Sequence, residues 1–183
     1  MTTFFTSDTH FGDTRALRFD HRPFPTLDAH DAGLIEGWNA RVGPDDTVWH
    51  LGDFALGPAP DRIAAILSAL AGEKHLVTGN NDGAATLALP GWASVTPYAE
   101  IAVEGRPLVL CHYAFRTWNG IGRGAVNLHG HSHGKLTPMP RQYDVGVDAQ
   151  NFRPVTLAEI LVSRRRGARQ ARAGRAEGEP PSG

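Results

Sequence analysis

Five short apolar segments of this chain are each followed directly by side chains that can bind a metal ion. The segments span residues 4–7, 48–51, 76–78, 108–111 and 126–129. The donors after them are two aspartates, one asparagine and four histidines, namely Asp8, His10, Asp53, Asn80, His112, His131 and His133. In α/β proteins, ligands bind beyond the carboxyl ends of the strands. The repetition therefore predicts an α/β fold in which five strands end at one shared site.

Between these segments, apolar residues recur at helical spacing, so the predicted elements alternate between strand and helix. We expect strands at residues 2–7, 47–51, 75–78, 95–103, 107–112, 126–129 and 143–147. We expect helices at residues 28–41, from Asp61 to the glycine at position 72, at 84–89 and at 155–165. This alternation is typical of mixed β-sheets packed together, with helices on the outside.

Length and composition favour a single domain inside the cell. A chain of 183 residues can build one sizeable core. No apolar run approaches the ~20 residues of a membrane span, and the first residues lack the basic and apolar regions of a signal peptide. The single cysteine, Cys111, excludes an internal disulfide and fits a reducing compartment. We therefore expect a cytoplasmic protein without a membrane partner.

Residues 164–183 differ in composition from the rest of the chain. They hold six arginines, two glutamates and no large aliphatic or aromatic side chain. Such a segment cannot bury an apolar face, so we expect residues 1–163 to form the domain and residues 164–183 a disordered tail. An arginine run can also bind nucleic acid, which is the alternative role for this tail.

The seven donors are too many for a single tetrahedral ion, and they lack the thiolates of a structural zinc site. They suit two ions that share a bridging carboxylate, and such a pair can activate a water and bind phosphoryl oxygens. Glycine directly precedes Asp53, Asn80 and His131, and we expect it to let the backbone turn steeply there. His50 and His129 lie inside predicted strands, where packing behind the site is favoured over metal binding.

The donors lie in five blocks whose order and composition resemble those of the calcineurin-like metallophosphoesterase superfamily, in particular its small prokaryotic and phage-like members. The blocks are Asp8-Thr9-His10, Gly52-Asp53, Gly79-Asn80-Asn81-Asp82, His112 and Gly130-His131-Ser132-His133. Residues 111–119 and 144–148 resemble two further stretches of the small members. The resemblance implies a four-layer αββα sandwich, in which two mixed β-sheets are flanked by helices and a dinuclear metal site lies at the carboxyl ends of the strands.

The resemblance also implies which donors share an ion. Asp53 would bridge both ions. The first ion would also be bound by Asp8, His10 and His133. The second ion would also be bound by Asn80, His112 and His131. The ions would be two divalent transition metals drawn from Mn, Fe, Zn, Ni or Co, with manganese favoured, because oxygen and imidazole ligands accept all of these.

One block departs from the pattern of the family. The superfamily usually has histidine at the position of Asn81, where it contacts the substrate phosphate and protonates the leaving group. The following acid, here Asp82, orients that histidine, so Asn81 and Asp82 are the catalytic candidates. An amide can donate a hydrogen bond to phosphate but cannot act as a general acid. We therefore predict that aryl phosphates, which have good leaving groups, are hydrolysed faster than alkyl phosphates.

Three further residues are candidates for substrate binding. Arginine offers a planar fork that fits phosphate, so Arg116 and Arg123 are candidates for that contact. Trp118 lies in the same stretch and is a candidate for lining the pocket. The alternatives are surface ion pairs for the two arginines and simple packing for the tryptophan.

These observations favour a metal-dependent phosphoesterase that hydrolyses small phosphomonoesters or phosphodiesters by direct attack of a metal-bridging hydroxide. Two alternatives use the same fold. One is a binding or scaffold module with weakened catalysis, although every ligand position is filled. The other is an enzyme that acts on nucleic-acid ends with the help of the arginine-rich tail. No oligomeric state is predicted.

Overall fold

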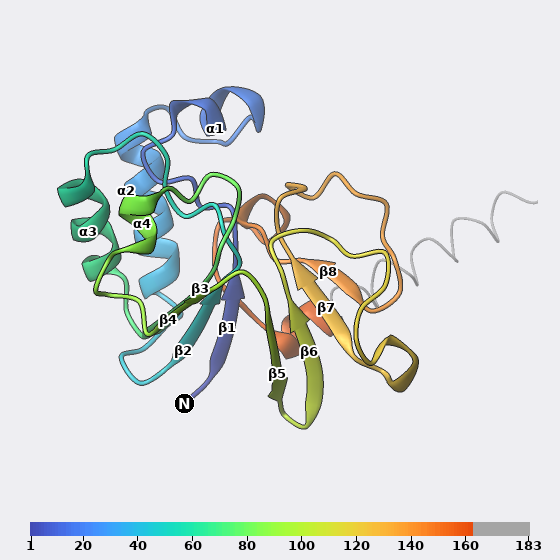
Figure 1. Cartoon of the computed structure of the whole chain (residues 1–183). Helices are drawn as coiled ribbons and strands as arrows, with labels where there is room; N and C mark the ends of the chain where they lie inside the picture. Colours follow the sequence, from blue (N-terminus) through green and yellow to red (C-terminus); the bar gives the residue numbers. More distant parts are fainter. Residues whose placement is uncertain (163–183) are drawn as a thin grey trace, which may run out of the picture.

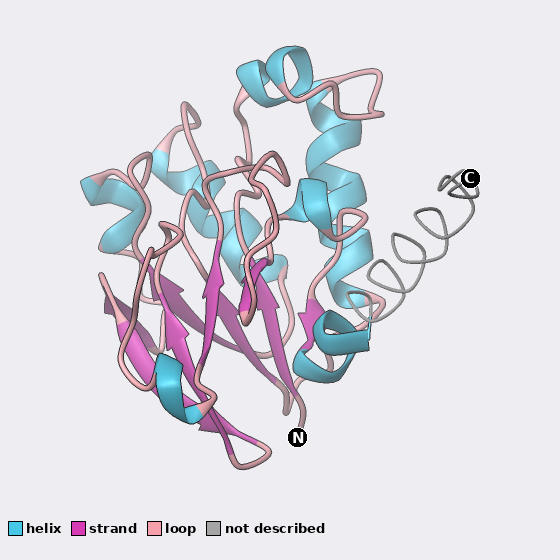
Figure 2. Ribbon diagram, turned by 90° about the vertical axis from the view of Figure 1, so that its right-hand side faces the viewer, coloured by secondary structure: helices cyan, strands magenta, loops and turns pink. Residues whose placement is uncertain are grey.

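Two β-sheets packed face to face form the centre of the molecule, and a computed structural model describes residues 1–162 of the chain (Figure 1). Most connecting loops gather at one end of the sheets, beyond the arrowheads of the strands (Figure 2). The α/β architecture with two mixed sheets and outer helices is therefore confirmed. The predicted tail at residues 164–183 lies outside the described residues.

The first sheet has five strands in the order β4-β3-β2-β1-β9. Their bounds are Thr3–Thr6 for β1, Thr47–His50 for β2, Glu73–Val77 for β3, Ser94–Thr96 for β4 and Val155–Thr156 for β9. All neighbours are parallel except β9, which runs antiparallel to β1. Since Thr6 lies opposite His50, β1 and β2 end at the same level, and the residues that follow them leave the sheet together.

The second sheet has four strands in the order β5-β6-β7-β8. Their bounds are Ala99–Val103 for β5, Arg106–Leu110 for β6, Val126–His129 for β7 and Gln142–Asp144 for β8. β5 and β6 form an antiparallel hairpin, and the other neighbours are parallel. Leu110 lies opposite Leu128, so the histidines that follow β6 and β7 leave this sheet close to one another.

Alternating side chains of β1 face different layers of the molecule. Phe4 packs toward the helices in a cluster with Trp38 and Leu67. Phe5, one position on, is fully buried between the sheets in a cluster with Leu128. Burying a large apolar side chain contributes roughly 1.5–3 kcal/mol, so these two clusters hold the layers together.

The helices α2, α3 and α4 cover the outer face of the first sheet, and α1 lies beyond its upper end (Figure 1). The helix bounds are Thr14–Phe19 for α1, Leu27–Asn39 for α2, Pro60–Ala69 for α3 and Ala84–Leu87 for α4, with 3-10 helices η1 at Ile121–Arg123 and η2 at Val147–Ala149. The loop-rich segment 113–125 covers the outer face of the second sheet, where Trp118 packs on Val109 of β6. Within residues 1–162, no helix has the length and apolar character needed to cross a membrane.

The single strand expected at residues 95–103 is wrong, because the chain forms β4 and β5 there, and these belong to different sheets. Pro97 lies between them and has no amide hydrogen for a sheet hydrogen bond. The chain therefore leaves the first sheet after Thr96 and enters the second sheet at Ala99. This crossing joins the two sheets.

Several other elements differ from the expectation in their boundaries. The segment expected as a helix from residue 155 begins with β9, where Val155 pairs with Phe5, and the helix starts at Leu157. Helix α2 begins one residue earlier than expected, because Thr26 accepts a hydrogen bond from the Ala29 amide and caps it. The strand expected at residues 143–147 ends at position 144, and helix α1 was not expected.

Candidate metal centre

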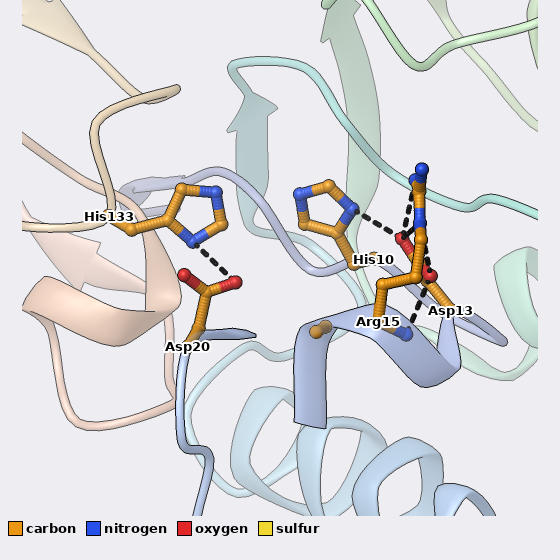
Figure 3. A pocket seen from close by; sticks show the side chains of 6 residues that line it. His10, Asp13, Arg15, Asp20 and His133 are labelled. Carbon is orange, nitrogen blue, oxygen red and sulfur yellow. Dashed lines mark hydrogen bonds and ion pairs between the residues drawn. The ribbon is translucent and has the colours of Figure 1, made fainter. Parts of the chain in front are cut away.

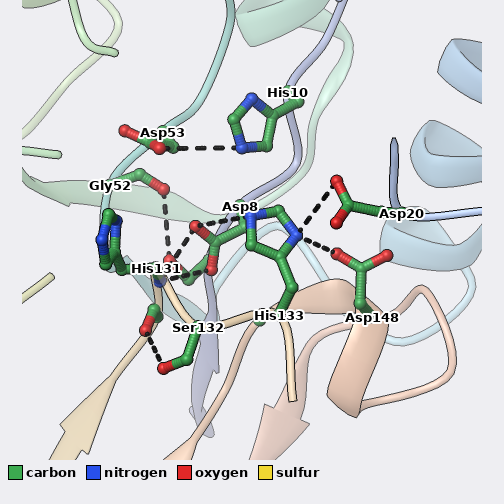
Figure 4. Close-up of polar contacts among 12 residues, drawn as sticks. Asp8, His10, Asp20, Gly52, Asp53, His131, Ser132, His133 and Asp148 are labelled. Atoms are coloured by element: carbon green, nitrogen blue, oxygen red, sulfur yellow. Dashed lines mark hydrogen bonds and ion pairs between the residues drawn. The ribbon is translucent and has the colours of Figure 1, made fainter. Parts of the chain in front are cut away.

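The structure brings six of the seven predicted ligands together in two groups of three at the carboxyl ends of the strands. The first triad is Asp8, His10 and His133, and the second triad is Asp53, His112 and His131. Within each triad, one possible ligand atom from each residue lies within 4.8 Å of the others. Figure 4 shows the first triad beside Asp53 and His131. The two triads thus form one continuous cluster of donors.

Asp53 lies between the two triads. Its Oδ2 is 3.6 Å from His10 Nε2 of the first triad and 3.5 Å from His112 Nε2 of the second. The carboxylate is 2% exposed and is directed into the cluster rather than toward solvent. A single oxygen at similar distances from one imidazole of each triad is the arrangement that a bridging carboxylate requires.

Asn80, the seventh predicted ligand, lies beside the second triad. Its Oδ1 is 3.1 Å from His112 Nε2. The Tyr113 hydroxyl, 3.3 Å away, donates a hydrogen bond to the same oxygen, and the Tyr113 ring packs edge-on against His112 and His131. The amide oxygen of Asn80 is therefore available to the same ion as the second triad.

The backbone at the ligands has an unusual conformation. Five of the ten non-glycine residues with positive φ in residues 1–162 are triad members. They are Asp8, His10, Asp53, His131 and His133, with φ between 48° and 65°. This left-handed conformation costs a non-glycine residue about 1–2 kcal/mol. The strands therefore end in strained residues at the point where they present the ligands.

The glycines before the ligands have two different roles. Gly52 adopts φ 94°, as expected for a steep turn. Gly79 and Gly130 do not adopt positive φ. Glycine is needed at these two positions because neighbouring atoms leave no room for a Cβ atom. A Cβ on Gly130 would lie 2.0 Å from Ser7 Oγ and 2.5 Å from Asp8 Oδ2. The expectation of a steep turn is thus met at Gly52, and close packing against an aspartate ligand explains the other two.

The burial of the first triad favours the binding of a cation. Asp8 is fully buried, and this burial raises the pKa of its carboxyl to about 8. Burial also lowers the pKa of His10 to about 4, and both of its ring nitrogens lack a hydrogen-bond partner among the described residues. A divalent ion would stabilise the ionised carboxylate and would bind the neutral imidazole. The residues present therefore fit a metal ion.

Two of the histidine ligands are oriented by hydrogen bonds from their other ring nitrogen. His112 Nδ1 lies 2.8 Å from the carbonyl oxygen of Leu51, which can only accept, so the ring donates there. His133 Nδ1 lies 2.7 Å from Asp148 Oδ2, and its Nε2 lies 3.9 Å from Asp8 Oδ1 (Figure 4). Metal-binding histidines usually donate their second N–H in this way. In both rings, Nε2 is left to face the cluster.

His50 and His129 pack behind the ligands. His50 is completely buried, its Nε2 lies 2.9 Å from the Thr9 hydroxyl, and burial lowers its pKa to about 3. His129 Nδ1 lies 2.9 Å from the carbonyl oxygen of Gly130. Neither belongs to a triad, as the packing interpretation predicts.

The two catalytic candidates both contact the loop that carries Asp53. Asn81 donates to the Asp53 carboxylate twice, from its backbone amide at 2.8 Å and from Nδ2 at 2.6 Å. The Asp82 carboxylate accepts hydrogen bonds from the backbone amides of Asp53, Phe54 and Gly79 at 2.8–2.9 Å. Asp82 therefore fixes the loops after β2 and β3 through these backbone amides, rather than the Asn81 side chain that the resemblance pairs with it.

None of the three substrate-binding candidates lines the pocket over the first triad. Trp118 is 7% exposed, and its Nε1 donates to the carbonyl oxygen of Ala125, so it packs on the second sheet. Arg116 and Arg123 are exposed, and neither lines the pocket over the first triad. That pocket has a volume of about 170 Å³ and is lined by His10, Asp13, Arg15, Ala16, Asp20 and His133 (Figure 3). Its arginine comes from α1.

Sequence reasoning missed Arg22, whose side chain is completely buried beneath the first triad. It pairs with Asp148 and with the backbone of Asp8 and Thr9. No local pattern marks this residue, because its partners lie between 8 and 126 positions away along the chain. Asp148 lies in a stretch that resembles the small family members, but that resemblance assigned it no role.

Comparison with known proteins places these blocks in a family. A family model described as the calcineurin-like phosphoesterase superfamily domain matches residues 1–142. The Gene 66 protein of Mycobacterium phage D29 is 32% identical over 177 residues, which cover 79% of this chain and 87% of that protein. An uncharacterized protein of Methanocaldococcus jannaschii is 27% identical over 163 residues, which cover 85% of this chain and 86% of that protein.

Solved structures show the same fold. A protein of unknown function from Aquifex aeolicus superposes with a TM-score of 0.71 at 22% identity, and the match covers 86% of this chain and 96% of that chain. The phosphoesterase Yfce from E. coli superposes with a TM-score of 0.50 at 17% identity, covering 86% of this chain and 82% of that chain. At these identities the likeness concerns the fold alone.

Proposed function

Because this chain belongs to the calcineurin-like phosphoesterase superfamily, we propose that it hydrolyses small phosphate esters with two divalent transition-metal ions held by the two triads. The first triad would hold one ion, and His112, His131 and Asn80 would hold the other. The single observation that supports this most is the position of Asp53, whose Oδ2 lies at similar distances from a histidine of each triad.

When bound, two divalent ions supply an activated water and neutralise charge on the phosphoryl oxygens. Direct attack by water then needs no protein nucleophile and forms no phosphoenzyme. Manganese is the favoured metal, and zinc, nickel, cobalt and iron suit the same oxygen and imidazole ligands.

Arg15 is the residue best placed to contact the substrate beside the first triad. It lines the pocket with His10 and His133 (Figure 3). Asp13 holds the guanidinium through Nε and Nη2 at 2.9–3.2 Å, and half of the side chain stays exposed. Nη1 makes no hydrogen bond among the described residues and is free to donate to a phosphate oxygen. Arg15 is therefore a further candidate for the phosphate contact, beside Arg116 and Arg123.

Asn81 lies beside the bridging carboxylate and would contact the phosphoryl group from the side of the second triad. Its amide nitrogen carries two hydrogens, and one of them is donated to Asp53 Oδ2. The other is free to donate to a phosphoryl oxygen, but an amide cannot protonate the leaving group. The substrates we propose are therefore phosphate esters whose leaving groups depart without a proton, such as aryl esters.

The test is an activity panel on protein whose metal content is known. Metal-free protein is loaded separately with Mn²⁺, Ni²⁺, Zn²⁺ or Mg²⁺ and assayed on p-nitrophenyl phosphate, bis(p-nitrophenyl) phosphate and matched alkyl esters. We expect turnover with the transition metals and faster hydrolysis of the aryl esters. Protein that binds two ions but hydrolyses none of these esters would favour the binding-module alternative.

The route of hydrolysis is tested by one turnover in ¹⁸O-labelled water. Direct attack places one labelled oxygen in the phosphate released in the first turnover. Label that enters the protein instead would identify a phosphoenzyme and would reject the proposed route.

A further inference from the structure

Arg22 and Asp148 form a buried ion pair next to the first triad, although 126 positions separate them in the sequence. Arg22 Nε donates to Asp148 Oδ1 at 2.9 Å, and Nη2 donates to Oδ2 at 2.8 Å. The Arg22 side chain is 0% exposed and that of Asp148 is 10% exposed. A planar, two-point contact of this kind fixes the orientation of both groups.

The Asp148 carboxylate has a second partner, and this partner is a metal ligand. Its Oδ2 lies 2.7 Å from Nδ1 of His133. Because the carboxylate is already paired with Arg22, it acts as an acceptor, and the ring must donate from Nδ1. The lone pair on Nε2 of His133 is then directed toward Asp8, 3.9 Å away. A carboxylate behind a histidine in this way orients the ring and raises its basicity toward a metal ion.

Arg22 also donates to backbone carbonyl oxygens next to the other two ligands of the first triad. Nη2 donates to the carbonyl oxygen of Asp8 at 2.6 Å, and Nη1 donates to that of Thr9 at 2.8 Å. Asp8 and His10, on either side of Thr9, both have positive φ. One buried guanidinium therefore holds the strained backbone of Asp8 and His10 and, through Asp148, the ring of His133.

The guanidinium is itself fixed from behind by helix α2. Arg22 Nη1 lies 2.8 Å from His30 Nε2, and His30 Nδ1 lies 3.0 Å from Asp31 Oδ1. Since arginine can only donate, His30 accepts at Nε2 and donates to Asp31. Asp31 also accepts from the amide of Gly12 at 3.1 Å. Every member of this chain of contacts is thereby oriented by its neighbours.

The second triad is held differently, since Asn81 donates to the carboxylate of Asp53 and Asp82 accepts from the Asp53 backbone amide. Its oriented ring, His112, donates to a backbone carbonyl, and His131 is exposed. The Arg22–Asp148 pair therefore acts on one of the two groups of ligands only.

We propose that Arg22 and Asp148 are positioning residues that set the affinity of the first triad for its metal ion. Asp148 fixes the ring of His133, and Arg22 fixes Asp148 together with the backbone of Asp8. This inference rests on the metal centre of the proposed function. It adds a requirement for two residues that touch neither ion nor substrate.

The test is a titration of metal-free protein with Mn²⁺ alone, in which free Mn²⁺ is counted by electron paramagnetic resonance. In Asp148→Asn, the side chain offers one acceptor oxygen, for which Arg22 and His133 compete. We expect the affinity for one of the two ions to fall by about 10- to 100-fold and the affinity for the other ion to stay unchanged. Arg22→Lys should act in the same direction, because an ammonium group cannot donate to Asp148, Asp8 and Thr9 in the same geometry.

The matched control is Glu159→Gln, which removes the carboxylate of another arginine pair between distant segments. Glu159 accepts from Arg41 at 2.7 Å, 118 positions away, and contacts neither triad. Its affinity for both ions should equal that of the natural protein. A second readout uses no metal: long-range ¹H–¹⁵N correlation spectra at alkaline pH should show His133 protonated at Nδ1 in the natural protein. This preference should weaken in Asp148→Asn, where Asp20 Oδ2, 3.4 Å from Nδ1, is the remaining carboxylate acceptor.

The outcomes separate this inference from the proposed function. If the natural protein binds fewer than two Mn²⁺ ions, the dinuclear centre is wrong. If it binds two, and Asp148→Asn binds both with unchanged affinity and an unchanged His133 tautomer, only the positioning role is overturned. A variant that loses affinity for both ions equally would also overturn it, because the effect would not be confined to the first triad.

Discussion

The two triads use the same kinds of ligand, but different parts of the molecule hold them in place. The first triad rests on a buried ion pair, in which Arg22 reaches Asp148 and the backbone of Asp8. In the second triad, Asp53 rests on two neighbouring loops, because Asp82 gathers the loops after β2 and β3 and Asn81 donates to the Asp53 carboxylate. His112 of this triad donates to the carbonyl oxygen of Leu51. One group of ligands depends on contacts between distant segments, and the other depends on two neighbouring loops of the first sheet.

This difference leads us to expect that metal binding and turnover depend on different halves of the site. The support of the first triad is buried, with the Arg22 side chain 0% exposed and the Asp148 side chain 10% exposed. The support of the second triad includes Asn81, which lies beside the bridging carboxylate and is placed to contact a phosphoryl group. A substitution under the first triad should therefore change mainly the affinity for metal, whereas one under the second should change both metal binding and turnover.

The largest effect is expected from Asp53→Asn, because Asp53 belongs to the second triad and its Oδ2 also lies 3.6 Å from His10 Nε2 of the first. Loss of its charge should release both ions and lower turnover by roughly 100- to 1,000-fold or more. Bound metal and hydrolysis of p-nitrophenyl phosphate are measured on the same sample. Asp46→Asn is the control, because Asp46 binds only backbone amides of Thr2 and Gly43. Full activity at normal metal content in Asp53→Asn would contradict the assignment of the whole centre.

A smaller and more selective effect is expected from Asn81→His, which supplies the group that an amide lacks. A histidine beside the phosphoryl group can protonate a leaving oxygen, so hydrolysis of alkyl phosphates should increase on the order of 10²-fold relative to aryl phosphates. The ratio of the two kcat/KM values measures this change, with metal content as the control. An equal change for both esters would mean that position 81 does not contribute to protonation.

Asp82→Asn should lower the metal affinity of the second triad and leave that of the first unchanged, which is the opposite of the result expected for Asp148→Asn. The amide that replaces one carboxylate oxygen cannot accept a hydrogen bond, so a backbone amide of the loops after β2 and β3 loses its partner. We expect a loss of about 1–3 kcal/mol in the free energy of unfolding. The affinity for one Mn²⁺ ion should fall by roughly tenfold. Urea unfolding and Mn²⁺ titration measure the two effects. An equal loss of affinity for both ions would show that the two triads are not supported independently.

The smallest effect belongs to Glu159, which contacts neither triad. Burial alone would raise the pKa of its carboxyl, but hydrogen bonds from Thr156 and Arg41 outweigh burial and lower it. A lowered pKa in the folded state means that the stabilisation is full above the ordinary value of 4.5 and is lost as the pH falls through the folded value. Because the pair is partly exposed, Glu159→Gln should cost less than about 1 kcal/mol near neutral pH. Unfolding curves of both proteins should converge in acid.

The sequence was sufficient for the parts of the molecule that depend on local pattern. Short apolar segments predicted β1, β2 and β7, and the polar residues after each strand predicted the candidate ligands that the structure brings together. Local pattern failed where one residue interrupts an apolar run, as Pro97 does between β4 and β5. It also failed for Arg22, because the burial of an arginine depends on partners such as Asp148 that only the folded chain brings near. Arg15 was missed for a similar reason, since α1 carries it to the pocket.

The left-handed backbone at five of the candidate ligands means that the residues suited to binding metal lower the stability of the metal-free fold. At each of these positions glycine would adopt the same φ with less strain, so replacing a ligand by glycine should relieve strain in the metal-free fold while it removes the metal. Selection for stability alone would therefore erode the site at His131 or His133 before it disturbed the sheets. Each of these five left-handed residues therefore costs the metal-free fold about 1–2 kcal/mol, which bound metal ions would have to offset.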